Sequence, residues 1–423
     1  MKKILLVFFG LVILILAIVY LSLWSHPVKA ETDIVIGREN IDKIDFRHLD
    51  SVTVAASTMY ESTLLKEIMQ GEQYRAEWAE PIKVPVVYLD KIHGGLRIIK
   101  KGGGKQTQSL RLKNEKGVVY TLRSVAKDPT PLIPDWANTL GIENIIVDGI
   151  SAQHPYGAMA VARLAEAIDL PHTHPRLVFI PKQEGLGEFT AAFGNKLYWL
   201  EYETEGEENW SDFKDIVALI DTEELQEQKW AHKDKLHIDT QALVRNRLFD
   251  IVIGDWDRHA KQWGWFLQKK EEGYIAIPLA SDRDNAFFSI DGLLPSIIAS
   301  KNVQPRLRPF QKEIDYMPGL VYPFDIYFLK GVPQEVFQTE AEYIKTHLTD
   351  AAIDGALASW PEEIYQLHGK EIKEIIKARR QHLERYALEF HKVLESKEFL
   401  TEPLKGSDDA EVPLELHRCF ECL

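Results

Sequence analysis

The stretch Gly254-Asp255-Trp256-Asp257-Arg258-His259-Ala260-Lys261-Gln262 decides how this chain is interpreted. It places two carboxylates, a guanidinium, an imidazole and an amide close together, directly after an apolar helical pattern that begins at Asp239 or Thr240. Charged groups beside a core are costly unless they are paired or bind a metal ion. The stretch is therefore either an ion-paired turn or part of a site that performs chemistry.

A second charged stretch, Ser281-Asp282-Arg283-Asp284-Asn285, follows a strand predicted over 274–278. Carboxylates at the exit of a strand can project into a cleft. Together the two stretches offer at least two carboxylates and an amide, whose oxygen atoms are the donors that Mg²⁺ and Mn²⁺ prefer. The pair therefore predicts a divalent-metal site better than either stretch does alone.

A glycine cluster, Gly102-Gly103-Gly104, lies between strands predicted over 95–100 and 108–112. Glycine lets a backbone approach an anion closely and present its N–H groups to it. No Gly-Lys-Ser or Gly-Lys-Thr sequence follows and no helix is predicted there, so this is not a Walker A loop. By itself the cluster indicates a mobile turn more than a phosphate-binding loop. The cations Arg123 and Lys127 come about one strand later.

The apolar patterns predict an α+β chain with two lobes, one of antiparallel strands and one mainly helical. An acidic stretch over 203–234 is interpreted as a patchily helical surface crossing between the lobes. In the first lobe the sequence predicts helices over 51–77 and 156–168 and strands over 82–89, 95–100, 108–112, 118–125, 176–180 and 196–202. In the second it predicts a helix from Asp239 to Gly254, a hairpin of 264–267 with 274–278, a mostly irregular stretch to Gln334 and a helix over 370–394.

The first thirty residues form a separate segment. Lys2 and Lys3 precede an almost wholly apolar run over 4–24, which at about 1.5 Å per residue is long enough to span a bilayer core of ~30 Å. An uncleaved anchor is favoured over a cleaved signal peptide, although Val28-Lys29-Ala30 resembles a cleavage site. Because the lysines precede the run, the N-terminus should stay in the cytoplasm and everything after the run should face outward.

Composition excludes several classes of protein. Of the 423 residues, 45% are hydrophobic and 27% are charged, which is typical of globular chains and not of disordered or disulfide-rich ones. The 50 Lys and Arg against 64 Asp and Glu give a formal net charge of −14, which opposes non-specific binding to nucleic acid. Nucleic acid is therefore not expected as a partner. The two cysteines, Cys419 and Cys422, are interpreted as part of a frayed tail.

The two charged stretches resemble a known group of enzymes. Asp257-Arg258-His259-x-x-Gln262 resembles the D-R-H-x-x-N catalytic loop of phosphoinositide kinases and the D-R-H loops of HipA-type and secretory-pathway kinases. Asp284-Asn285-x-Phe287 is similar to their Mg²⁺-binding D-N-G or D-F-G segment. More closely, residues 248–259 together with Asp282-Arg283-Asp284 and Phe287 resemble an uncharacterised kinase-like module of bacterial envelope proteins, mostly from Bacteroidetes. The resemblance covers roughly 96–394 and implies a two-lobed protein-kinase-like fold.

The resemblance also implies a role for each matching residue of the two charged stretches. Asp257 would accept the proton of a substrate hydroxyl, with Arg258 and His259 beside it in the catalytic loop. Asp284 would bind the metal that bridges the nucleotide phosphates, and Asp282 is the alternative ligand for that metal. The expected division of the chain is an anchor or signal peptide at 1–30, a tether and N-terminal extension at 31–95, an N-lobe at 96–202, a C-lobe at 203–400 and a tail at 401–423.

Further roles are implied for the first lobe. Gln262 stands where those kinases place a metal-binding Asn, and its longer side chain makes the metal geometry different. The glycine cluster 102–104 would cover the phosphates, and either Arg123 or Lys127 would contact them. Arg123 lies within the strand as the usual lysine does, while Lys127 has the expected chemistry. Glu166, on the alanine-rich helix, would pair with that cation or remain a solvated helix residue.

These features imply metal-dependent phosphoryl transfer from ATP or another nucleotide to a hydroxyl of a protein, lipid or glycan, in the bacterial periplasm or cell envelope. The alternative is a catalytically inactive kinase-fold module that binds or scaffolds, and a weaker one is another nucleotide-dependent transfer such as adenylylation. Because the chain retains the ionisable residues of the catalytic positions, catalysis is favoured over binding alone. The bacterial envelope is generally thought to lack ATP, and this favours a binding module or an unusual phosphoryl donor. His172-x-His174, framed by Pro171 and Pro175, has no evident third ligand and is interpreted as a loop.

Overall fold

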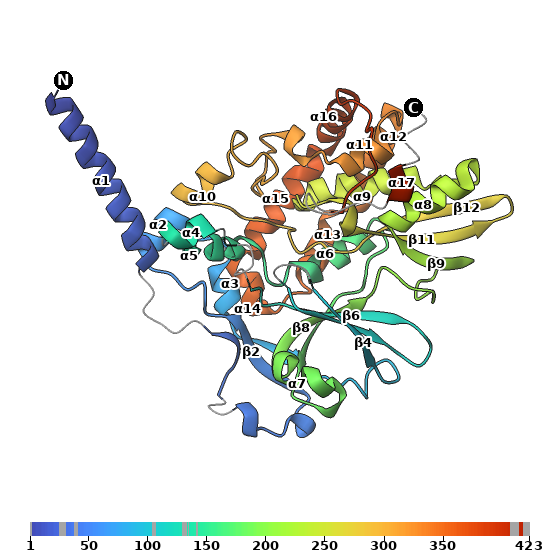
Figure 1. Cartoon of the computed structure of the whole chain (residues 1–423), viewed down its shortest axis with the longest axis horizontal. Helices are drawn as coiled ribbons and strands as arrows, with labels where there is room; N and C mark the ends of the chain where they lie inside the picture. The colour runs from blue at the N-terminus through green and yellow to red at the C-terminus, as the bar shows by residue number, and fades with distance from the viewer. Residues whose placement is uncertain are drawn as a thin grey trace.

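In the computed structural model the strands form three separate sheets and the C-terminal half is mainly helical (Figure 1). This arrangement confirms the α+β class, with one antiparallel lobe and one helical lobe, that the sequence predicts. The structure describes residues 2–24, 31–37, 41–103, 107–128, 133, 135–140, 143–406 and 414–417. Gly104, Cys419 and Cys422 lie outside these ranges.

A five-stranded antiparallel sheet, in the order β4-β5-β6-β8-β7, is the centre of the first lobe. Successive residues of a strand point to opposite faces. Leu110, Leu112 and Leu122 are therefore buried together on one face, and Arg111 and Arg123 lie on the other. The strands are β4 Arg97–Gly102, β5 Ser109–Lys113, β6 Val119–Ser124, β7 Arg176–Ile180 and β8 Lys196–Tyr202, of which the last two match the predicted ranges.

A three-stranded antiparallel sheet precedes it and corrects one prediction. The sequence predicts a helix over 51–77, but residues Ser51–Ser57 form a strand, β2, that pairs on both sides. This pairing with β1 and β3 makes the segment a strand, and it buries Val52 and Val54, which are β-branched. The neighbouring elements are β1 Thr32–Val35, β3 Ile82–Pro85, α2 Leu64–Gln70 and α3 Arg75–Ala79.

The second lobe contains a four-stranded sheet in the order β10-β12-β11-β9. The predicted hairpin is confirmed as β11 and β12, which pair antiparallel along their whole length. The acidic crossing predicted over 203–234 is better ordered than expected, since it contains both a strand and a regular helix. The elements are β9 Ile216–Asp221, α8 Thr222–His232, β10 Leu236–Ile238, β11 Trp263–Lys270 and β12 Gly273–Ala280.

Helix α9, Thr240–Ile253, carries the loop that the sequence singles out. The side chain of Asp239 caps it as predicted, accepting the backbone N–H of Ala242 at 3.0 Å. The helix ends at Gly254, whose φ is +72°, in the left-handed region. A Cβ at this position would lie 2.5 Å from the ring of Phe310, so only glycine fits and the loop leaves the helix in a fixed direction.

Of the remaining helices, α11, α12, α15 and α16 pack against α9. The helix predicted over 370–394 is in fact two, separated at His382, and the stretch predicted as irregular up to Gln334 contains two short helices. The helices are α4 Asp135–Leu140, α5 Glu143–Asp148, α6 Gly157–Glu166, α7 Thr190–Phe193, α10 Leu293–Ile298, α11 Pro323–Leu329, α12 Gln334–His347, α13 Asp350–Leu357, α14 Glu362–Ile364, α15 Lys370–Gln381, α16 Leu383–Glu395 and α17 Leu414–His417.

Helix α1, Lys2–Trp24, extends away from the body of the protein (Figure 1). Its residues Lys3–Leu23 have a mean hydropathy of 3.3, and among the described residues this is the one helix long and apolar enough to cross a membrane. Its C-terminal end contacts α2, where the Gln70 amide donates to Ser22 Oγ at 3.3 Å. A membrane anchor and a signal sequence both contain a helix of this kind.

Candidate functional site

A cleft of about 990 Å³ lies between the five-stranded sheet and the loops that follow α9 and β12. The fold brings to it most of the residues that the sequence singles out, from four separate segments of the chain. Arg258 and Glu166 do not line the cleft. Those that do are Gly102, Gly103, Arg123, Lys127, Asp257, His259, Gln262, Asp282 and Asp284.

Asp257 occupies the loop after α9, where Asp255 Oδ1 accepts its backbone N–H at 3.1 Å. His259 Nε2 lies 3.9 Å from Asp257 Oδ1. Burial, and then the charge of Asp284, raises the pKa of Asp257 from 3.8 to about 6. A carboxyl group with a pKa in this range can both lose and take up a proton near neutral pH, which is the requirement for a general base.

Asp282 and Asp284 occupy the loop after β12. Asp282 Oδ1 accepts the backbone N–H of Asp284 at 3.2 Å, which fixes the two carboxylates relative to each other. Burial raises the pKa of Asp282 more than Arg123 lowers it. Burial also acts to raise the pKa of Asp284, but Lys127 and Arg123 outweigh it and leave that pKa lowered. Asp284 is therefore the more readily ionised of the two and the better ligand for a hard cation.

Two buried arginines, Arg258 and Arg283, hold these loops from beneath. Both pair with one buried carboxylate of α9, since Asp250 lies 3.1 Å from Arg258 Nε and 3.0 Å from Arg283 Nε. Arg247 adds a third pair at 2.9 Å. Burial acts to raise the pKa of Asp250, but the three guanidinium groups, Arg258 foremost, lower it overall. The Arg258 side chain thus lies beneath the loop and does not line the cleft.

The cations Arg123 and Lys127 both face carboxylates of the cleft. Arg123 forms ion pairs with Asp282 and with Glu201 of β8. Lys127 forms an ion pair with Asp284. Each of the two alternatives for phosphate contact, Arg123 or Lys127, therefore pairs with a carboxylate expected to bind metal.

The glycine strand forms one wall of the cleft. Gly103 has a φ of +123°, and a Cβ on it would lie 2.3 Å from the carbonyl oxygen of Thr107. A side chain at this position is excluded by both backbone conformation and space. Gly102 and Gly103 both line the cleft, and the residue at position 103 has to be glycine.

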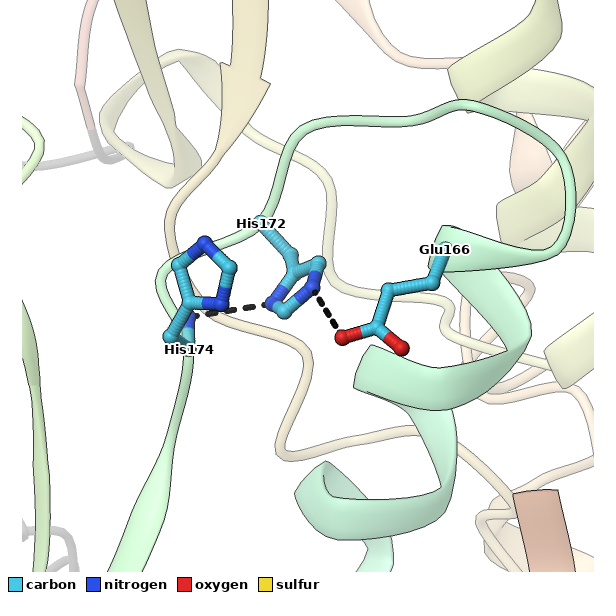
Figure 2. A group of neighbouring side chains, drawn as sticks. All are labelled: Glu166, His172 and His174. Atoms are coloured by element: carbon cyan, nitrogen blue, oxygen red, sulfur yellow. Dashed lines mark hydrogen bonds and ion pairs between the residues drawn. The ribbon is translucent and has the colours of Figure 1, made fainter. Parts of the chain in front are cut away.

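Glu166 does not meet Arg123 or Lys127 and lies at the end of α6 beside two histidines (Figure 2). It pairs with Arg163 at 2.9 Å, and His172 Nε2 lies 3.2 Å from its Oε1. The donor atoms of Glu166, His172 and His174 lie within 4.8 Å of one another, so the view that His172-x-His174 lacks a third partner is wrong. Because the backbone N–H of His174 donates to His172 Nδ1 at 3.0 Å, the ring proton of neutral His172 lies on Nε2 and points to Glu166. The arrangement is that of a hydrogen-bonded cluster.

This cluster borders a second cavity, of about 760 Å³, separate in its chemistry from the cleft. Its walls include four aromatic side chains, Tyr120, Tyr202, Trp210 and Phe213, and Tyr202 is stacked on Trp210 at 4.6 Å between ring centroids. Burial lowers the pKa of His172 to about 4, which keeps this ring neutral. The cavity contains none of the carboxylates of the two charged loops.

Sequence reasoning missed two residues of the cleft, Glu201 and Gln153, and gave no separate role to Asn285. Glu201 is the buried partner of Arg123, and the pairing of β6 with β8 is what brings it there. Asn285 donates to Asp284 Oδ1 at 3.0 Å, and Gln153 donates to Asn285 Oδ1 at 2.6 Å. The strand pattern of β8 places Glu201 on the same face as Trp199, but only the sheet order shows that this face meets Arg123.

No family model matches the chain, and no curated protein matches it. Among solved structures it is similar to HipA of Shewanella oneidensis MR-1, in the complex with HipB and operator DNA, with 12% identity, a TM-score of 0.36, and 72% of this chain and 70% of that chain covered. It is also similar to the Helicobacter pylori proinflammatory kinase CtkA, with 11% identity, a TM-score of 0.33, and coverage of 68% and 94%. Similarity at this level is a distant likeness to a kinase-like fold and shows nothing finer.

Proposed function

We propose that the chain is an atypical kinase that transfers a phosphoryl group from ATP or another nucleotide to a hydroxyl of a protein, lipid or glycan. The observation that carries the proposal is one cleft whose lining includes the carboxylates of Asp257, Asp282 and Asp284, the amide of Gln262 and the cations Arg123 and Lys127. Phosphoryl transfer is catalysed almost entirely by positioning and by neutralising charge, and these are the groups it requires.

The residues of the cleft fit a hard divalent cation. Asp284, Asp282 and Gln262 offer carboxylate and amide oxygens, the donors that Mg²⁺ and Mn²⁺ prefer. Asp284 would be the principal ligand because its pKa is the lowered one of the pair. When bound, such an ion neutralises charge on the phosphates of the nucleotide.

Each remaining residue has a definite task in the proposed reaction. Lys127 would contact the phosphates, and the backbone N–H groups of Gly102 and Gly103 would lie against them. Asp257 would orient the acceptor hydroxyl and take its proton as the oxygen attacks phosphorus. Arg258, paired with Asp250 beneath the loop, would hold Asp257 in place.

We also propose that α1 anchors the chain in a membrane with the two lobes on the outer side. The supports are the apolar length of Lys3–Leu23 and the position of Lys2 and Lys3 before it. An active reporter fused after Leu423 that works only outside the cytoplasm would support this topology. Activity of a cytoplasm-only reporter at the same site would contradict it.

A second candidate function is a binding or scaffold module without catalysis. The observation that favours it is the double pairing in the cleft, of Lys127 with Asp284 and of Arg123 with Asp282. A nucleotide–metal complex held by Asp284 and Lys127 would have to replace at least the ion pair between those two residues. A module that binds a neutral ligand would leave them intact.

Ligand-dependent thermal stability of the full chain separates the two candidates. A nucleotide at 100 times its Kd should stabilise the folded protein by about 2.7 kcal/mol, and only when Mg²⁺ or Mn²⁺ is present if the kinase proposal holds. Asp284→Asn is the matched control, and it should abolish the metal-dependent part of the shift. Absence of a shift with every nucleotide and either metal would leave the binding module as the better account.

A further inference from the structure

The outer faces of α2 and α10 form an exposed apolar surface, here called the α2–α10 patch. Outside α1, fourteen large apolar side chains of the described residues are exposed, and six of them belong to this patch. Ile68 and Ile297, which are 55% and 64% exposed, border a shallow depression between the two helices. Single exposed apolar residues are ordinary, but a contiguous group marks an interaction surface. The members are Leu64, Leu65, Ile68, Leu293, Ile297 and Ile298.

Helix α2 has the reverse of the polarity that a surface helix of a soluble protein has. Its polar residues Lys66 and Gln70 are buried, with Lys66 Nζ 2.7 Å from Asp148 Oδ1. Its apolar residues Leu64 and Ile68 face outward and are 73% and 55% exposed. Burial of a lysine is costly even when it is paired. In α2 a lysine is buried while a leucine and an isoleucine are exposed. This indicates that the outer surroundings of α2 are apolar.

The two helices are held together rigidly. Both carboxylate oxygens of Asp291, which precedes α10, accept backbone N–H groups at the end of α2, from Glu72 and Gln73, each at 3.2 Å. A Cβ on Gly292 would lie 2.2 Å from the backbone nitrogen of Gly71, so the backbones of these two segments are in direct contact. The patch is therefore a fixed part of the fold.

The patch adjoins the end of the apolar helix α1. Ser22 and Leu23 are buried against the domain, and Ser22 accepts a hydrogen bond from Gln70 of α2. Figure 1 shows α1, α2 and α10 on one side of the molecule, with α8 and β12 on the opposite side. If α1 crosses a bilayer, the level of Ser22 and Leu23 is where acyl chains give way to headgroups, and α2 lies at that level.

We propose that the α2–α10 patch rests in the lipid–water interface and gives the protein a second contact with the membrane beside α1. The inference depends on the proposed anchoring by α1 for the position of the bilayer. Interfacial helices typically bury their apolar face about 5–10 Å into this boundary, a depth that short side chains such as Leu64 and Ile297 can reach. The contact fixes how the cleft is oriented above the membrane and favours acceptors that lie at or near the lipid surface.

Depth-dependent fluorescence quenching of the full chain tests this inference. Cys419 and Cys422 are replaced by serine, and single cysteines are introduced as Ile297→Cys in the patch, Trp230→Cys on α8 and Leu14→Cys in α1. Each variant carries an environment-sensitive fluorophore and is reconstituted into phosphatidylcholine vesicles with bromine atoms at a shallow acyl position. Trp230 is the matched control because it is an exposed large apolar residue, 50% accessible, on the opposite side of the molecule.

We expect loss of fluorescence at positions 297 and 14 and none at position 230. Quenching at 14 without quenching at 297 would overturn the membrane contact of the patch and leave the anchor in place. Quenching at neither position would contradict both proposals. Ile68→Cys is a second patch variant on the other helix, and it must agree with Ile297→Cys for the inference to stand. Shielding of both labels from aqueous iodide without lipid quenching would identify a protein, such as a second copy, as the occupant and would also overturn it.

Discussion

Arg123 of β6 and Asp282 of the loop after β12 form an ion pair that joins the five-stranded sheet to the second lobe across the cleft. Arg123 also pairs with Glu201, which is buried within the sheet. Burial alone would lower the pKa of the Arg123 guanidinium, but Asp282 and Glu201 outweigh it and raise that pKa. Arg123 therefore joins the two lobes, and we propose Lys127 as the cation that contacts phosphate.

Replacing these two cations should give opposite results. Arg123→Met leaves the buried Glu201 carboxylate unpaired and should lower the free energy of unfolding by about 3 kcal/mol. Lys127→Met leaves Asp284 partly exposed and should cost less than about 1 kcal/mol of stability while removing nucleotide-dependent stabilisation. Urea unfolding with and without nucleotide measures both quantities. If the Arg123→Met protein is stable but no longer binds nucleotide, then Arg123 contacts the phosphates and Lys127 does not.

Asp250 should be among the most sensitive positions for stability. Its carboxylate is the common partner of Arg247, Arg258 and Arg283, all of them buried. Asp250→Asn removes that charge and leaves buried guanidinium groups undercompensated, at a cost of about 3–5 kcal/mol. The matched control is Asp354→Asn, an exposed carboxylate 3.3 Å from Lys373, which should change stability by less than about 0.5 kcal/mol. Similar urea midpoints for the two variants would contradict the prediction.

Local sequence pattern was sufficient for the elements that define the site. The apolar, β-branched and aromatic runs of β7 and β8, the cap at Asp239 and the glycine stop at Gly254 all follow from rules that act within a few residues. The two charged stretches could likewise be recognised because carboxylates beside buried elements need an explanation. Placing them in one cleft required only that the hairpin close, and it does.

What could not be predicted depends on partners far away in the chain. Residues 51–57 contain enough alanine and valine to fit a helical pattern, and only their pairing with β1 and β3 makes them a strand. Glu166 and Glu201 are both acidic residues near a predicted element, and nothing local shows which of them meets Arg123. The reversed polarity of α2 was also invisible, since an amphipathic pattern does not say which face is inside.

Asp33 offers a pH test of the contact between β1 and the five-stranded sheet. Its buried carboxylate accepts the backbone N–H of Leu197 at 2.8 Å, and burial raises its pKa from 3.8 to about 6. Because the folded-state pKa is the higher one, the contribution of Asp33 to stability is complete below pH 3.8 and is lost as pH rises through about 6. The loss at pH 7 is at most roughly 3 kcal/mol.

Asp33→Asn keeps the acceptor oxygen and tolerates the left-handed backbone at this position, where φ is +56°. The variant should therefore match the wild type near pH 4 and be more stable than it at pH 7. Free energies of unfolding measured at both pH values give the comparison. Parallel pH profiles of the two proteins would show that Asp33 titrates normally.

The two carboxylates after β12 should differ in their effect on metal binding. Asp284→Asn should remove divalent-dependent nucleotide binding with little loss of stability, because its partner Lys127 can move to solvent. Asp282→Asn should mainly destabilise the interface with Arg123 and leave metal dependence measurable. Titration of Mn²⁺ followed by its paramagnetic signal distinguishes the variants. Loss of metal binding in Asp282→Asn alone would reverse the assignment, and no effect in either would exclude a metal site at these carboxylates.

The last prediction concerns Asp257 and separates an enzyme from a binding module. A group that takes the proton of the acceptor hydroxyl typically contributes about 10²–10⁴-fold to the rate and little to ground-state affinity. Asp257→Asn should therefore lower kcat steeply while the nucleotide Kd changes only a few-fold. Because Asp257 has a pKa raised to about 6 and must be ionised to act, the wild-type rate should increase as pH rises through that value.

The fold should survive this substitution, since Arg258 is held by Asp250 at 3.1 Å and does not depend on Asp257 for its partner. The alternative account, in which Asp257 is only part of an ion-paired turn, predicts a variant that unfolds more easily but keeps its specific activity when folded. Thermal unfolding and single-turnover rates measured on the same preparations distinguish the two accounts. An unchanged rate in a destabilised Asp257→Asn protein would mean that the Asp-Arg-His stretch supports a fold and not a reaction.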